Sequence, residues 1–156
     1  MKEVAVLLLV ALMLNGCGSS TTTTQTAASG VWSADLTGGV GQASAFSFTT
    51  QFTVSGNGSL SITAFQFLTS GTCFPITGGT QSGSMVLTTN TTTNGVTGPF
   101  TYTVQSGGNT LTLNGTVTGT AATTTLTGGL ITGTWAVTGA TGCNASGQNF
   151  TMTQKS

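Results

Sequence analysis

Apolar and polar residues alternate along most of the chain beyond its N-terminal segment. The clearest case is residues 45–54, where Phe46, Phe48, Phe52 and Val54 share one parity and hydroxyl or amide side chains take the other. Such alternation is typical of a β-strand with one buried face, because successive side chains point to opposite faces. Turns rich in Gly and Asn separate the alternating segments. The pattern predicts eight strands, at residues 30–37, 45–54, 59–68, 82–89, 96–105, 110–119, 123–138 and 148–154.

Two of these strands change their apolar parity along their length. In the third, the change falls between Ile62 and Phe65, and in the seventh it follows Leu126. A β-bulge inserts one extra residue into a strand, so that apolar side chains before and after it face the same side. We therefore predict bulges near Ala64 and at the Gly128-Gly129 pair.

The order of the predicted elements indicates an all-β fold. After residue 17 no segment has a helical period, and short connections between strands favour a meander. Open sheet edges are commonly protected by charged side chains, but this domain contains only Asp35 and Lys155. Closing the sheet removes the edges, so we predict an eight-stranded antiparallel up-and-down barrel. A two-sheet β-sandwich is the alternative, which Pro99 favours because proline prefers edge strands and bulges.

Charge is almost absent, and this excludes several classes of function. The charged residues are Lys2, Glu3, Asp35 and Lys155, and the chain has no histidine. A basic surface for nucleic acid is therefore excluded. Beyond the N-terminal segment a single carboxylate remains, whereas glycosidases use two and Ser or Cys nucleophiles need a histidine base. We expect a protein that is not an enzyme, with no catalytic, cofactor-binding or metal-binding residues.

The N-terminal segment has the pattern of an export signal. Val4 to Leu14 are eleven consecutive apolar residues after Lys2. This run is too short to span a hydrocarbon core of about 30 Å, which takes about 20 residues, and it fits a signal-peptide core. The sequence Leu14-Asn15-Gly16-Cys17 that follows resembles the lipobox of bacterial lipoproteins.

The lipobox resemblance implies a processing route and a location. Residues 1–16 would be a signal peptide removed before Cys17, and Cys17 would carry a diacylglyceryl group and usually an N-linked acyl chain such as palmitate. Two or three chains hold a protein stably on a bilayer, which is then a partner of the mature protein. Gly18 stands where an aspartate often marks inner-membrane retention, so the resemblance implies the cell envelope and, in diderm bacteria, the outer membrane.

The segment after the lipobox has no hydrophobic period. Residues 18–29, rich in Thr and Ser, predict a flexible linker. The expected organisation is therefore a signal peptide at 1–16, the lipidated Cys17 with its linker at 17–29, and one β domain at 30–156.

Two cysteines remain once Cys17 is set aside. Cys73 and Cys143 form an even pair in an exported domain, and we predict a disulfide between them. In a meander of eight strands, the loops after the third and seventh strands emerge at the same end, away from the tether. In a barrel these loops lie on opposite sides of the mouth, so the 69–81 loop must fold across the opening.

The start of the domain carries a second, shorter resemblance. Gly30-Val31-Trp32 is similar to the Gly-x-Trp element of lipocalins, and Gly133-Thr134-Trp135 repeats it. This resemblance implies a barrel that carries a small apolar ligand. The domain as a whole resembles uncharacterised Thr- and Gly-rich exported proteins.

The inward-facing positions decide between the two functions that remain. They are rich in Phe and Trp, and side chains alone can fill an eight-stranded barrel. We therefore expect a membrane-anchored lipoprotein with a structural or interaction domain that contacts an envelope polymer or another protein. The alternative is the lipocalin-like carrier.

Overall fold

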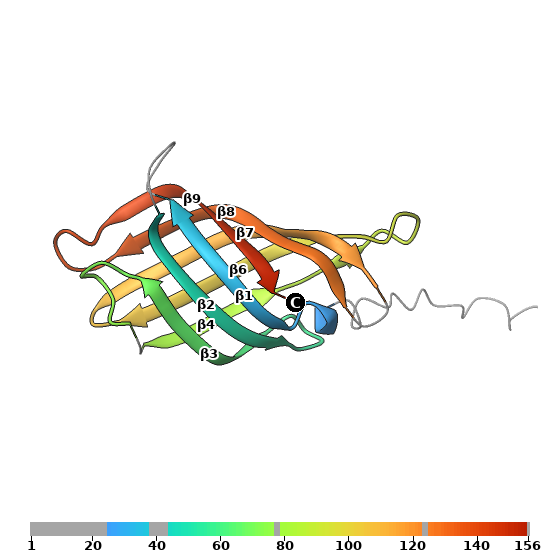
Figure 1. The fold of residues 1–156 in the computed structure, drawn as a ribbon, viewed down its shortest axis with the longest axis horizontal. Coiled ribbons are helices and arrows are strands. Elements are labelled where there is room, and N and C mark those ends of the chain that lie inside the picture. The colour runs from blue at the N-terminus through green and yellow to red at the C-terminus, as the bar shows by residue number, and fades with distance from the viewer. Residues whose placement is uncertain (1–24, 38–43, 77–78, 123–124, 156) are drawn as a thin grey trace, which may run out of the picture.

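The computed structural model describes residues 25–37, 44–76, 79–122 and 125–155 (Figure 1). Within these ranges, nine antiparallel strands form a single sheet. The strands are β1 (Gly30–Thr37), β2 (Ser44–Val54), β3 (Leu60–Thr69), β4 (Thr80–Met85), β5 (Thr88–Thr89), β6 (Gly95–Ser106), β7 (Asn109–Ala121), β8 (Leu126–Thr138) and β9 (Ala145–Lys155).

The sheet curls into a nearly closed barrel. Its strand order is β3-β2-β1-β9-β8-β7-β6-β4, and the short β5 also pairs with β6, in line with β4. The first and last strands are joined by a ladder in which Val31 lies opposite Lys155 and Leu36 opposite Phe150. The predicted antiparallel up-and-down barrel with eight strand positions is therefore confirmed, and the sandwich alternative is wrong.

The barrel closes least completely between β3 and β4, and we call this line the seam. At one end of the seam the Met85 N–H donates to the Gly58 carbonyl at 2.8 Å. At the other end the Phe67 N–H donates to the Ile76 carbonyl at 3.1 Å. Between these points the described residues of β3 and β4 form no continuous ladder. Every other neighbouring pair in the sheet order has one.

Pro99 lies inside the barrel wall and divides the predicted strand 82–89 into β4 and β5. The Val86 N–H donates to the Pro99 carbonyl at 3.2 Å, but proline has no N–H to return the bond. The register is the same on both sides of this break, since Met85 lies opposite Phe100 and Thr88 opposite Thr97. The barrel accommodates the proline by losing one bond of a ladder, so Pro99 requires no sandwich edge.

Both predicted bulges are present. In the β2–β3 ladder Gln51 lies opposite Ala64 and Phe52 opposite Ile62, which makes the intervening Thr63 the extra residue. In the β7–β8 ladder Thr118 lies opposite Leu130 and Thr120 opposite Thr127. The Gly128-Gly129 pair therefore faces a single residue of β7. Gly128 has φ = 64°, a value that glycine adopts without strain.

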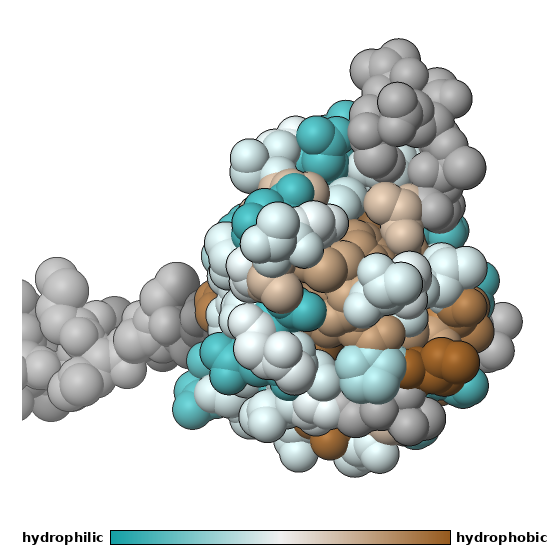
Figure 2. All heavy atoms as spheres, turned by 90° about the vertical axis from the view of Figure 1, so that its left-hand side faces the viewer, coloured by the Kyte–Doolittle hydropathy of each residue, from teal (hydrophilic) through white to brown (hydrophobic). Residues whose placement is uncertain are grey.

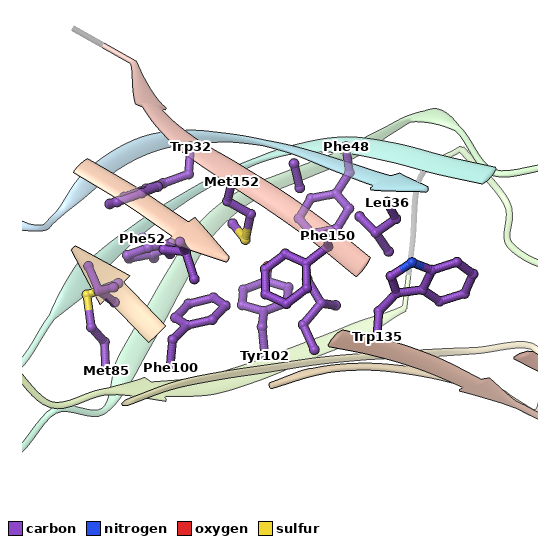
Figure 3. Close-up of a cluster of buried hydrophobic side chains, with 14 of the residues drawn as sticks. Trp32, Leu36, Phe48, Phe52, Met85, Phe100, Tyr102, Trp135, Phe150 and Met152 are labelled. Atoms are coloured by element: carbon purple, nitrogen blue, oxygen red, sulfur yellow. The ribbon is translucent and has the colours of Figure 1, made fainter. Parts of the chain in front are cut away.

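Inward-facing side chains fill the space between the walls (Figure 3). Trp32 stacks on Phe52 with ring centroids 6.0 Å apart, and Tyr102 stacks on Phe48 at 5.8 Å and on Phe100 at 6.1 Å. The largest side chains that are essentially inaccessible to solvent are Trp32, Tyr102, Phe48, Phe52, Phe67, Phe100, Leu36, Met85, Leu87, Leu111, Leu113 and Ile131.

Residues 25–29, which the sequence assigns to the linker, contact the barrel. Gln25–Ala27 are helical and, with Ala28, they enter one mouth of the barrel, where Ala28 has no exposed surface. The Trp32 indole N–H donates to the Ala28 carbonyl at 3.0 Å, and the Ser29 hydroxyl accepts from the Val54 N–H at 2.8 Å. Residues 25–29 therefore pack against the barrel, and the rest of the predicted linker, 18–24, lies outside the described residues.

Candidate functional site

The two ends of the barrel differ in what closes them. At the tether end lie residues 25–29, the start of β1 and the end of β9 (Figure 1). At the opposite end, which we call the lid end, lie the described residues of the β3–β4 loop (70–76 and 79) and the β8–β9 loop (residues 139–144). The cysteines predicted to pair are Cys73 in the first of these loops and Cys143 in the second.

The predicted disulfide is present at the lid end. Cys73 and Cys143 are bonded, with Cα atoms 5.6 Å apart. In the sheet order, β2 and β1 lie between β3 and β9, so the two loops start from different sides of the mouth. The β3–β4 loop therefore reaches across the opening to make the bond, as predicted. We call the described residues 70–76 of this loop the lid.

Phe74 fills the mouth beneath the lid. Its side chain is only 3% exposed, and its ring stacks on Phe67 at 5.2 Å and meets Phe46 edge-on at 5.8 Å. Trp135 extends this cluster, with its ring edge-on to Phe46 at 5.3 Å. Figure 2 views this end of the molecule: moderately hydrophobic residues lie at the centre of the face, near-neutral and hydrophilic residues surround much of it, and strongly hydrophobic residues lie at its right-hand edge.

The Asn109 side chain also holds the lid in place, through hydrogen bonds from the β6–β7 turn. Its amide nitrogen donates to the Cys73 carbonyl at 2.6 Å, and its amide oxygen accepts from the Ala140 N–H at 2.8 Å. One buried side chain thereby links both disulfide loops to the β6–β7 turn. Sequence reasoning missed this residue, because Asn after Gly-Gly is equally typical of a solvated turn.

The tether end has an open pocket of about 460 Å³. It lies between the helical turn, the β8 bulge and the end of β9, and its lining includes Leu126 and Lys155. The Gln154 amide nitrogen donates to the Ala27 and Ser29 carbonyls, at 3.4 and 3.2 Å. Its amide oxygen is buried without a protein partner. The pocket is thus mostly neutral, with one ammonium group beside it.

The ionisable side chains of the described residues are dispersed. Asp35 and Lys155 are exposed, and they lie four positions apart along the β1–β9 ladder, which is about 13 Å. Tyr102 lies inside the barrel, where its hydroxyl shares a 2.8 Å hydrogen bond with Thr50. Burial raises the pKa of Tyr102 well above its ordinary value, and the bond to Thr50 opposes this shift. The phenol is therefore neutral at physiological pH.

The structure brings together two of the three predicted site residues. Cys73 and Cys143 form the disulfide, whereas Cys17 and the predicted signal peptide lie outside the described residues. Within the described ranges, His, Cys, Asp and Glu form no group of three that could hold a metal ion. The described part of the chain contains no helix with the length and apolar character needed to span a membrane. Comparisons with family models, curated proteins and solved structures give no match to this chain.

Proposed function

We propose that the protein is a lipid-anchored envelope lipoprotein whose barrel is a structural or interaction domain without catalytic activity. The anchor is supported by the sequence Leu14-Asn15-Gly16-Cys17 after an apolar run of signal-peptide length. Acyl chains on Cys17 would attach the domain to the bilayer in which it acts, in diderm bacteria the outer membrane.

The observation that favours a structural or interaction domain over a carrier is the filled interior. A carrier of an apolar ligand needs a hollow barrel, whereas Trp32, Phe52, Phe100 and Tyr102 are stacked across this one and have almost no exposed surface. The lid and Phe74 also close the mouth opposite the tether. These features favour a rigid body over the lipocalin-like carrier.

The outer wall supports an interaction role with a neutral partner. On β7, β8 and β9 the outward positions carry mostly hydroxyl and amide side chains, as in the facing pairs Thr116–Thr132 and Thr132–Thr151. Such a wall hydrogen-bonds water or a polar polymer without adding charge. An uncharged envelope polymer or a polar protein surface is the chemistry it fits.

The lipid anchor is tested on the protein purified from native membranes. The N-terminal peptide should start at Cys17 and carry the mass of a diacylglyceryl group plus an acyl chain. A Cys17→Ser variant should leave the membrane fraction, whereas Ser19→Ala, which keeps the lipobox, should stay there. An unmodified Cys17 would refute the anchor.

The choice between interaction domain and carrier needs a separate measurement. Native mass spectrometry of the purified protein should show only the mass of the processed, acylated chain. An apolar compound bound in equal amount, and released when the disulfide is reduced, would favour the carrier instead.

A further inference from the structure

The exposed apolar side chains are concentrated along the seam. Four large apolar residues of the described ranges are exposed, namely Val31 (38%), Leu68 (58%), Ile76 (62%) and Val86 (47%). Leu68 lies on β3, Ile76 is in the lid with its carbonyl bonded to β3, and Val86 follows β4. Three of the four therefore flank the single line along which the barrel wall is not laddered.

Partly buried apolar side chains continue this line between its two ends. Leu60, Ile62 and Phe65 project inward from β3 but stay partly accessible, and the facing strand β4 has Gly83 on its inward face. A Cβ atom at Gly83 would lie only 2.9 Å from a methyl group of Leu60, so this strand leaves room for the β3 side chains. We call Leu60, Ile62, Phe65, Leu68, Ile76 and Val86 together the seam stripe.

The seam stripe differs in composition from the rest of the wall. The stripe consists of Leu, Ile, Phe and Val, whereas elsewhere the outward positions are mainly Thr, Ser, Asn and Gln. An apolar surface framed by polar residues marks a contact site, since monomers rarely leave large apolar patches in water.

The chain leaves the barrel beside this stripe. The Gln25 amide nitrogen donates to the Met85 carbonyl at 3.2 Å. A Cβ atom at Gly58 would lie 2.7 Å from a Val86 methyl and 3.2 Å from the Gln25 amide nitrogen, so Gln25 and Val86 meet at the same glycine. Only seven residues separate Cys17 from Gln25, and even fully extended they keep the two within about 28 Å.

We propose that the seam stripe faces the bilayer that holds the acyl chains of Cys17, which makes this inference dependent on the proposed lipid anchor. The barrel then lies along the membrane with β3 and β4 towards the lipid and with the hydroxyl-rich β8 and β9 towards water. The short tether keeps the stripe at a high effective concentration near the surface, so a weak apolar contact suffices to orient the domain. An upright barrel would instead hold the lid end far from the lipid.

The orientation is tested with single reporter cysteines in the lipidated, full-length mature protein. Thr80 and Thr134 are exposed threonines on the seam side and on the opposite wall, at β4 and β8. Thr80→Cys and Thr134→Cys variants are labelled with an environment-sensitive dye and reconstituted in phosphatidylethanolamine–phosphatidylglycerol vesicles containing spin-labelled lipid. Lipid quenching should be severalfold stronger at position 80 than at position 134. Equal quenching at the two positions overturns the proposal.

A second variant asks whether the apolar side chains cause the orientation. Leu68→Thr, Ile76→Thr and Val86→Thr combined should abolish the difference in quenching while the protein still sediments with vesicles. A difference that survives these replacements overturns the role of the stripe. Shielding of position 80 that needs no vesicles and increases with protein concentration also overturns it, because a second copy would then cover the seam. Failure of the parent protein to sediment with vesicles would refute the lipid anchor itself.

Discussion

Removing the disulfide gives the sharpest test of how the lid end is held. We consider the double variant Cys73→Ala and Cys143→Ala. The bond closes a loop of 70 residues. In the chain-entropy model this constraint on the unfolded chain stabilises the protein by about 4 kcal/mol at 25 °C. A domain of this size has a total stability of about 5–15 kcal/mol, so the loss is a large fraction of it.

Phe74 reports whether the lid stays in place without its covalent bond. Phe74→Ala in the disulfide-bonded protein should cost about 3–4 kcal/mol, because the ring is buried against Phe46 and Phe67. Asn109 still links the lid to the β6–β7 turn when the disulfide is absent. Cys73 and Phe74 are neighbours in the chain, so the two changes can couple by about 0.5–3 kcal/mol. If the bond to Asn109 holds the lid, Phe74→Ala should still cost at least about 1 kcal/mol in the double-alanine background.

The assay is urea unfolding, monitored by tryptophan fluorescence. It compares four proteins: the parent, Phe74→Ala, the double-alanine variant, and the double-alanine variant that also carries Phe74→Ala. A stability loss below about 1 kcal/mol for the disulfide variant would contradict the loop-entropy estimate. If Phe74→Ala costs nothing without the disulfide, the lid has left the mouth, and the bond to Asn109 does not hold it.

Three further outcomes follow from the core and the tether end. Tyr102 is the only tyrosine in the chain, and burial raises its pKa. The folded state therefore keeps the proton that the unfolded chain loses near pH 10, so stability should fall as the pH rises above about 10. Phenolate absorbance and urea unfolding measure this fall, which Tyr102→Phe should abolish while costing about 1 kcal/mol at neutral pH. Gly133→Ala should cost more than about 3 kcal/mol in thermal unfolding, because its Cβ would lie 2.1 Å from the Asn114 carbonyl oxygen. Gly142→Ala meets open space and should cost only about 1 kcal/mol for its positive φ. Gln25→Ala should cost about 1–2 kcal/mol in urea unfolding, and no loss would show that residues 25–29 are not part of the folded domain.

Local patterns in the sequence were sufficient to predict most of the barrel wall. A strand repeats every two residues, so the parity of Phe46, Phe48 and Phe52 states which face is buried without reference to any other strand. The bulges were predictable for the same reason, because apolar side chains on both sides of a parity change, as at Ile62 or Leu126, reach one face of a strand only if an extra residue lies between them.

The disulfide was predictable because it follows from counting. With Cys17 set aside, two cysteines remain, and antiparallel strands alternate in direction, so the loops of Cys73 and Cys143 must emerge at one end. The lid follows from the same count, since a bond across a barrel mouth requires one loop to span it. The lipid anchor of Cys17 stays a prediction from the N-terminal pattern.

Contacts between distant segments were decided only by the tertiary structure. Residues 25–28 pack at the tether end, where Gln25, Ala27 and Ala28 are buried and the Ala28 carbonyl accepts from the Trp32 indole. No hydrophobic periodicity in the sequence marks such a segment. Asn109 links two loops only because the folded chain brings the Cys73 carbonyl and the Ala140 N–H within hydrogen-bonding distance of its side-chain amide.

The position of the seam shows the same limit most clearly. The sequence by itself determined that the barrel has eight strand positions and which side chains fill it, since both follow from the period and length of each strand. It did not determine that the first and last strands would share a full ladder while β3 and β4 would not. Closure of a barrel depends on the twist and stagger accumulated over all its strands, and no single segment encodes that sum.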